Sequence, residues 1–221
     1  MPVPVRSLRL ADAREAEDLS AFLARLIHYD RAAAVRLQAG KGALAVFGRP
    51  PSFEVLAIRT ARLAEGVELD VTVSAGELLD SLGGGADFAV PAPVTGPPWA
   101  GVLPPRGGWQ EVPGLPDVSA MRGAVSAAVA EFRARDEALP VERRTRAERD
   151  RIGREIWSRT VAGTGLPLRA AHAAQSLGFL RPGMPVALMS AGTWLRLRTP
   201  YGSIAVRTTG LGGLSLTPTG P

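Results

Sequence analysis

Alternating and helical patterns of apolar residues account for most of the first part of the chain. Apolar side chains recur at helical spacing over residues 16–27, after Asp12 and Glu15, which have the spacing of a capping box, so we predict a helix from about 12 to 28. Residues 67–74 alternate strictly between apolar and polar side chains, which predicts a strand with one buried and one solvated face. Further strands are predicted at residues 3–10, 33–38, 43–47 and 53–63. We therefore expect a main helix packed on the apolar side of an antiparallel sheet.

The second half of the chain shows helical patterns followed by short strand patterns. Helices are predicted at residues 117–137, 141–162 and 167–177, and strands at 185–189, 193–198 and 203–208. Asp117 is placed to cap the first of these helices, and Gly178 to end the third. The predicted fold class is thus α+β, in which three helices and a small β-meander follow the N-terminal helix and sheet.

Residues 91–116 separate these two halves and contain eight prolines together with Trp99 and Trp109. Proline removes a backbone donor, so we expect little regular structure in this stretch. We interpret it as a connector that its two tryptophans pin to a protein surface. The predicted organisation is a domain at 1–90, the connector at 91–116, a basic domain at 117–209 and a flexible tail at 210–221. In the alternative, the connector folds back and both halves form one domain.

Charge is distributed unevenly between the halves. Residues 1–120 carry 11 basic and 14 acidic side chains, a net −3, whereas residues 121–221 carry 15 basic and 7 acidic ones, a net +8. From residue 156 onward there are six arginines and no aspartate or glutamate. This asymmetry favours contact between the second half and an anionic partner. The simpler alternative is a basic surface that only maintains solubility or docks on an acidic protein.

The strand pattern near the C-terminus places cations beside an aromatic ring. Side chains alternate between the faces of a strand, so Trp194, Arg196 and Arg198 share the face opposite to the leucines between them. Arg207 lies on the following strand. Such a surface suits a polyanion, because guanidinium groups bind phosphate oxygens in a bidentate manner and indole rings stack on bases. The favoured alternative for Trp194 is a structural one, in which its ring covers the open side of the small sheet and the arginine stems lie over it.

The order of helix, four-residue turn, helix and hairpin in residues 142–207 resembles the layout of winged helix-turn-helix domains. The resemblance implies that the helix at 167–177 enters the major groove of DNA, where Arg169, His172 and Gln175 are candidates for contacts with base edges. The arginines of the hairpin would then meet phosphates. The alanines of this helix depart from the pattern, since an alanine-rich helix is more typical of close helix packing.

Composition excludes several classes of site. The chain has no cysteine, which excludes disulfides and thiolate metal sites, and its only histidines are His28 and His172. No glycine-rich phosphate loop is present, so neither a cofactor nor a metal is predicted. No apolar run approaches the roughly 20 residues that span a bilayer, and the first residues lack the apolar core of a signal peptide. We therefore expect a cytoplasmic protein without membrane contact.

The leading hypothesis is a non-enzymatic binding protein whose basic C-terminal half contacts nucleic acid, in an accessory role in transcription or in the nucleoid. The alternative is a protein–protein interaction module or regulatory adaptor without nucleic-acid binding. A third hypothesis is an enzyme whose active site has no recognisable sequence motif. Nucleic-acid binding predicts that Arg169, Arg196 and Arg198 lie on one exposed, contiguous positive surface. An adaptor requires an exposed apolar patch at Trp99 or Trp109, or an unprotected strand edge.

Overall fold

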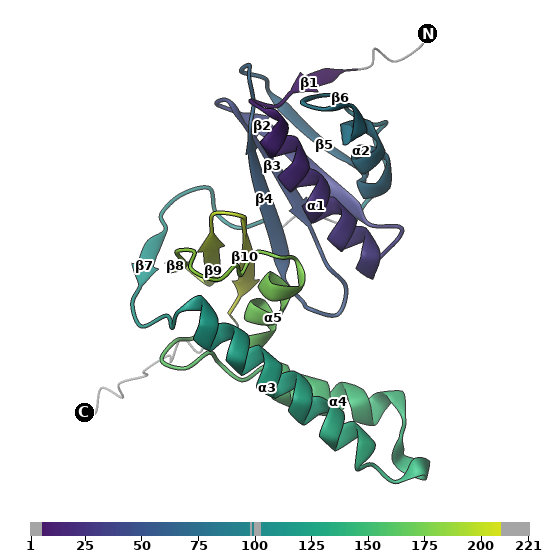
Figure 1. Ribbon diagram of the computed structural model, residues 1–221, viewed down its shortest axis with the longest axis vertical. Coiled ribbons are helices and arrows are strands. Elements are labelled where there is room, and N and C mark those ends of the chain that lie inside the picture. The colour runs from purple at the N-terminus through teal and green to yellow at the C-terminus, as the bar shows by residue number, and fades with distance from the viewer. Residues whose placement is uncertain (1–5, 98, 100–102, 209–221) are drawn as a thin grey trace, which may run out of the picture.

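A computed structural model describes residues 6–97, 99 and 103–208 of the chain. Its main feature is one antiparallel sheet in the order β5-β2-β3-β4-β10-β9-β8-β7 (Figure 1). These strands are β2 (Ala34–Gly40), β3 (Ala43–Gly48), β4 (Leu56–Arg62), β5 (Leu69–Ser74), β7 (Gln110–Val112), β8 (Ala187–Ala191), β9 (Trp194–Thr199) and β10 (Gly202–Arg207). A separate small sheet pairs β1 (Ser7–Arg9) with β6 (Asp87–Ala89). With the helices described below, the predicted α+β class is confirmed.

The N-terminal half follows its sequence pattern closely. Helix α1 (Ala13–Tyr29) covers one face of the N-terminal strands (Figure 1). Asp12 caps it as predicted, because its carboxylate accepts a hydrogen bond from the Glu15 amide at 3.0 Å. Between β2 and β3, Lys41 and Gly42 both have positive φ, at 53° and 75°, as a two-residue hairpin turn demands. The short helix α2 (Ala75–Ser81) follows β5.

Two long helices of the C-terminal half form a hairpin that projects from the body of the molecule (Figure 1). They are α3 (Val118–Glu137) and α4 (Arg146–Trp157), and we call the hairpin they form the arm. Asp117 caps α3 as predicted, accepting a hydrogen bond from the Ala120 amide. The predicted helix at 141–162 is too long, because Thr145 caps a new start and residues 141–143 form a separate 3-10 turn.

Helix α5 (Leu168–Ser176) ends as its glycine predicts. Gly178 has φ of 76° and donates to the carbonyl of Gln175, while the Phe179 amide donates to that of Ala174 at 2.8 Å. This pair of bonds is the Schellman arrangement, which uses the freedom of glycine to satisfy the last carbonyls of a helix. The Phe179 ring then packs in the core.

Pairing between β4 and β10 joins the two halves of the chain. Ser203 lies opposite Ile58, and Ala205 opposite Leu56, so the N-terminal and C-terminal strands share one hydrogen-bonded sheet. The main hydrophobic core is likewise continuous through residues of both halves. The division into domains at 1–90 and 117–209 stays a prediction. In the structure, both the sheet and the main core contain residues from the two predicted domains.

Parts of the connector pack on the sheet or pair with it. Trp99 is 8% exposed and packs in a second apolar cluster with Trp194, to which Trp109 adds its half-buried ring. The expectation of little regular structure is wrong for β7, because its residues find hydrogen-bond partners on β8, with Glu111 opposite Met189. The tail predicted at 210–221 lies outside the described residues. Among the described residues, every helix is too short or too polar to span a bilayer.

Candidate nucleic-acid interface

The seven residues predicted to contact nucleic acid lie on two opposite sides of the eight-stranded sheet. In β9, Leu195 and Leu197 pack on the main core, whereas the side chains beside them face the other way. We call this second side the outer face, and it holds Trp194, Arg196, Arg198 and Arg207. The remaining three, Arg169, His172 and Gln175, belong to α5, which packs against β10 on the core side.

Helix α5 serves as a packing helix. Its four alanines, Ala170, Ala171, Ala173 and Ala174, are completely buried, and their small size lets the helix approach its neighbours closely. The Arg169 side chain is 24% exposed, and its Nε lies 3.9 Å from a carboxylate oxygen of Glu54. The His172 ring stacks on Trp157 at 4.3 Å, and burial lowers the pKa of this histidine. The structure therefore does not bring these residues together with the arginines of the hairpin.

Arg196 lies on the β9 part of the outer face and is held in place by its neighbours. Its Nε donates to the buried Ser203 hydroxyl at 2.8 Å, and its guanidinium lies 5.7 Å from the centre of the Trp109 ring. Burial, and secondarily the charge of Arg198, lowers the pKa of Arg196. An arginine remains charged at neutral pH despite such a shift, so the outer face presents a partly desolvated cation.

Arg198 and Arg207 extend the positive charge on either side of Arg196. Both are exposed, and Arg207 lies 5.3 Å from the centre of the Trp194 ring. That ring is 8% exposed, so it supports the arginine but is covered by its neighbours. The geometry therefore favours a Trp194 ring that supports the Arg207 guanidinium over the predicted role of Trp194 as a base-stacking residue.

Arg106 is a fourth cation on the outer face, which the sequence pattern did not single out. Two hollows adjoin on this face, of about 740 and 260 Å³, and Arg106 lines both of them. Arg196 lines the smaller hollow, together with Thr60 and the connector prolines. Since the hollows also share Gln38 and Ala45, they form one groove that runs from β9 across β4 and β3 toward β2.

The far end of this groove is closer to neutral. Arg36 donates from Nε and Nη2 to the two oxygens of Asp70, at 2.7 and 2.8 Å, and this pairing lowers the pKa of Asp70. Glu68 lines the same end, together with Arg6 and Lys41. The excess of positive charge on the outer face therefore lies toward its C-terminal strands.

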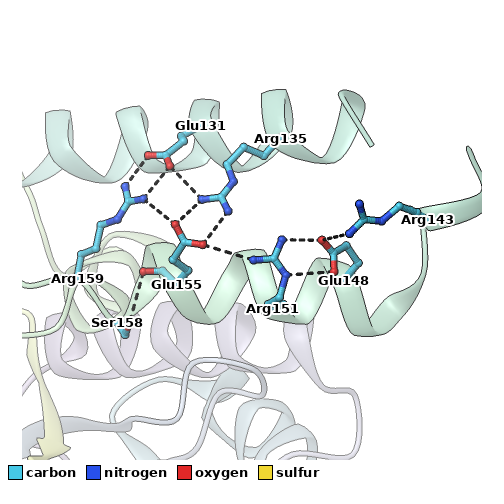
Figure 2. A network of polar contacts seen from close by, with 8 residues as sticks. All are labelled: Glu131, Arg135, Arg143, Glu148, Arg151, Glu155, Ser158 and Arg159. Carbon is cyan, nitrogen blue, oxygen red and sulfur yellow. Dashed lines mark hydrogen bonds and ion pairs between the residues drawn. The ribbon is translucent and has the colours of Figure 1, made fainter. Parts of the chain in front are cut away.

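Five arginines of the arm, and Arg159 just beyond α4, are by contrast paired with carboxylates, whereas Arg122, Arg133, Arg144 and Arg154 have none within 4.0 Å among the described residues. Arg159 contacts both oxygens of Glu131 at 2.6 and 2.8 Å, and Arg135 contacts both oxygens of Glu155 at 2.8 Å (Figure 2). The Arg135 guanidinium lowers the pKa of Glu155 to about 2. Five further ion pairs within 4.0 Å involve Arg143, Arg146, Arg149 and Arg151.

The four arginines at the C-terminal end of the outer face have no such partners. Among the described residues, no carboxylate lies within 4.0 Å of Arg106, Arg196, Arg198 or Arg207. Residues 1–5, 98, 100–102 and 209–221 contain no aspartate or glutamate either. Over the described part of the chain there is also no group of three carboxylate or histidine side chains placed to hold a metal ion.

Comparison with known families divides the chain within its connector. Residues 3–101 match a family model described as a domain of unknown function, DUF8010, and residues 104–211 match another, DUF8185. The boundary falls inside the segment predicted as a connector. No curated protein matches the chain.

Proposed function

We propose that this protein binds single-stranded nucleic acid, without catalysis, through the outer face of its sheet. The observation that carries the proposal is the group of arginines on this face, Arg106, Arg196, Arg198 and Arg207, which lack carboxylate partners among the described residues, whereas five arginines of the arm are ion-paired. Lysine and arginine contacts to phosphates supply most of the affinity of non-specific nucleic-acid binding.

The shape of the surface favours a single strand over a duplex. A single strand binds along a positively charged groove and stacks its bases on aromatic side chains. The groove between β9 and β2 offers such a track, with the half-buried Trp109 at its cationic end. A winged-helix mode requires a recognition helix free to enter the major groove, whereas α5 is packed with buried alanines against α3 and β10. In this proposal the protein acts in the cytoplasm, as an accessory to transcription or to the nucleoid.

The test is a fluorescence-anisotropy titration with labelled single-stranded and duplex DNA and RNA at low salt. We expect the single strands to bind, and Arg198→Ala/Arg207→Ala to weaken that binding about tenfold or more through two lost phosphate contacts. The matched control is Arg146→Ala/Arg154→Ala, which removes the same charge from exposed positions on the arm.

Two results would reject the proposal. One is a failure of any strand to bind at low salt. The other is an equal loss of affinity in both double variants, which would mean that net charge alone drives the association. Either result would favour the protein-adaptor alternative, for which the exposed edge strand β7 is the first region to test by cross-linking.

A further inference from the structure

Arg196 is a partly buried cation that lacks a charged partner. Burial lowers the pKa of its guanidinium, which has therefore lost part of its hydration. Charges that leave water on folding are normally matched by an opposite charge. Within the described ranges, however, no carboxylate lies within 4.0 Å of Arg196. The position therefore suits an anion from outside the described part of the chain.

Hydrogen bonds hold the Arg196 side chain and its surroundings in place. Its Nε donates to the Ser203 hydroxyl at 2.8 Å, and Ser203 is only 3% exposed. The centre of the Trp109 ring lies 5.7 Å from the guanidinium, and Trp109 Nε1 donates to the Pro105 carbonyl at 3.0 Å. Towards other described residues the Arg196 side chain makes only the bond to Ser203, so Nη1 and Nη2 remain available. A donor group that is already ordered loses little conformational freedom when a ligand binds.

The smaller hollow of the outer face brings further donors to the same place. It measures about 260 Å³ and is lined by Arg196 of β9, Arg106 of the connector and Thr60 of β4. No Asp or Glu is among its lining residues. Sites for whole small molecules begin at roughly 300 Å³, so this hollow suits a single small group.

The acidic residues of the adjoining larger hollow leave these donors free. Both Asp70 oxygens are engaged by Arg36, at 2.7 and 2.8 Å, and one of them also accepts from Gln38 at 3.1 Å. The charge of Arg106 is the smallest of the causes that lower the pKa of Asp70, and it acts without a contact within 4.0 Å. Arg106 is therefore not neutralised by this carboxylate.

A tetrahedral anion fits the donors of the smaller hollow better than a planar one. A guanidinium fork engages two oxygens at once, so a single arginine already uses both oxygens of a carboxylate. The oxygens of a phosphate group point in different directions, and they can accept from donors on three separate elements. The adjoining hollow of about 740 Å³ has room for the rest of a phosphate ester.

We propose that Arg196, Arg106 and Thr60 form a site for one phosphate group, with Ser203 as the positioning residue for Arg196. The site deepens the proposed function, on which it rests for the identity of its ligand, because it names the point at which the backbone of a strand is held. The neighbouring nucleotides would lie along the larger hollow.

A chemical-shift titration of the Arg196 Nε–H and Trp109 Nε1–H signals tests the site. Dimethyl phosphate and acetate carry the same charge at neutral pH but differ in shape. At constant ionic strength we expect dimethyl phosphate to shift both signals and to bind about tenfold more tightly than acetate. Inorganic phosphate distinguishes the two sources of the group: a preference for it of more than about tenfold over dimethyl phosphate would assign the site to a free or terminal phosphate, and a smaller one to the strand backbone.

Variants assign the contacts to their residues, with the Trp109 signal as the common reporter. Arg196→Met and Arg106→Met should each weaken dimethyl phosphate about tenfold, and the second, at an exposed position, tests the site even if the first fails to fold. Ser203→Ala keeps the net charge but should lower the preference for dimethyl phosphate over acetate, which a merely structural role would not change. Arg154→Met, exposed on the arm, is the charge-matched control. Equal binding of dimethyl phosphate and acetate, or wild-type binding by Arg106→Met and Ser203→Ala, would overturn the proposal.

Strand binding separates this site from the broader proposal. If single strands bind and Arg198→Ala/Arg207→Ala weakens them while Arg196→Met does not, the phosphate site is refuted and the nucleic-acid proposal stands. If dimethyl phosphate binds as expected but no strand does, the phosphate site stands and the nucleic-acid proposal fails.

Discussion

Arg59 offers the most informative stability prediction, because it ties the two halves together from within the core. Its side chain is only 6% exposed, and Nη2 lies 3.2 Å from Asp18 and 3.5 Å from Glu15 on α1. Nη1 donates to the carbonyl of Pro200, in the turn between β9 and β10, at 3.3 Å. Arg59→Ala would thus remove one side chain that holds the N-terminal helix, strand β4 and the C-terminal hairpin together.

The expected loss of stability depends on which other ion pairs Glu15 and Asp18 keep when Arg59 is removed. Removing one member of a buried ion pair costs about 3–5 kcal/mol, because the other charge is left without compensation. Here Glu15 keeps Arg62 at 2.9 Å and Asp18 keeps Arg181 at 3.6 Å. We therefore expect the lower end, a loss of about 3 kcal/mol. For a domain of this size that corresponds to a fall in Tm of about 6–12 °C.

Urea unfolding followed by both tryptophan fluorescence and circular dichroism provides the assay. All four tryptophans lie at position 99 or beyond, so fluorescence reports the connector and C-terminal half, whereas circular dichroism reports both halves. The control is Arg62→Ala, which removes an arginine that contacts the same Glu15 but is 69% exposed, so it should destabilise the protein clearly less than Arg59→Ala does. Equal losses in the two variants, or a loss below about 1 kcal/mol for Arg59→Ala, would refute the reasoning.

Three other changes test separate parts of the structure. Gly202→Ala would place a Cβ 2.5–2.8 Å from three ring atoms of the buried Phe179, at φ of 150°, so calorimetry should show a loss of about 2–4 kcal/mol. Glu155 has a pKa of about 2 instead of its ordinary 4.5, so its contribution to stability is full above about pH 4.5 and is lost as the pH falls toward 2. Glu155→Gln should therefore flatten the acid side of a plot of Tm against pH, and an unchanged slope would contradict the role of Arg135. Trp109→Ala should weaken single-strand binding several-fold in anisotropy, because its partly exposed ring lies beside Arg196 on the outer face.

Local signals in the sequence predicted local structure well. The caps at Asp12 and Asp117 and the glycine end of α5 each depend on hydrogen bonds within a few residues, so the residue types that make them are visible in sequence. The alternation in β9 also placed Arg196 and Arg198 correctly on one face.

Long-range packing was beyond the reach of these patterns. Nothing in the periodicity of β4 or β10 specifies that Ile58 pairs with Ser203, since strand pairing depends on which edges remain free once the halves meet. The same applies to α5, whose alanines indicated close packing although its polar residues suggested an outward face. Arg106 gave no signal at all, because a single cation between proline and glycine has no periodic pattern.

The salt dependence of single-strand binding tests the central claim most directly. Each phosphate contact contributes about 0.7 to the slope of log K against log salt concentration for a single strand. Arg198→Ala/Arg207→Ala should therefore reduce the magnitude of that slope by about 1.4 relative to the wild type, whereas Arg146→Ala/Arg154→Ala should leave it unchanged. The account is contradicted by an outer-face variant whose slope equals that of the wild type, or by a control that loses as much.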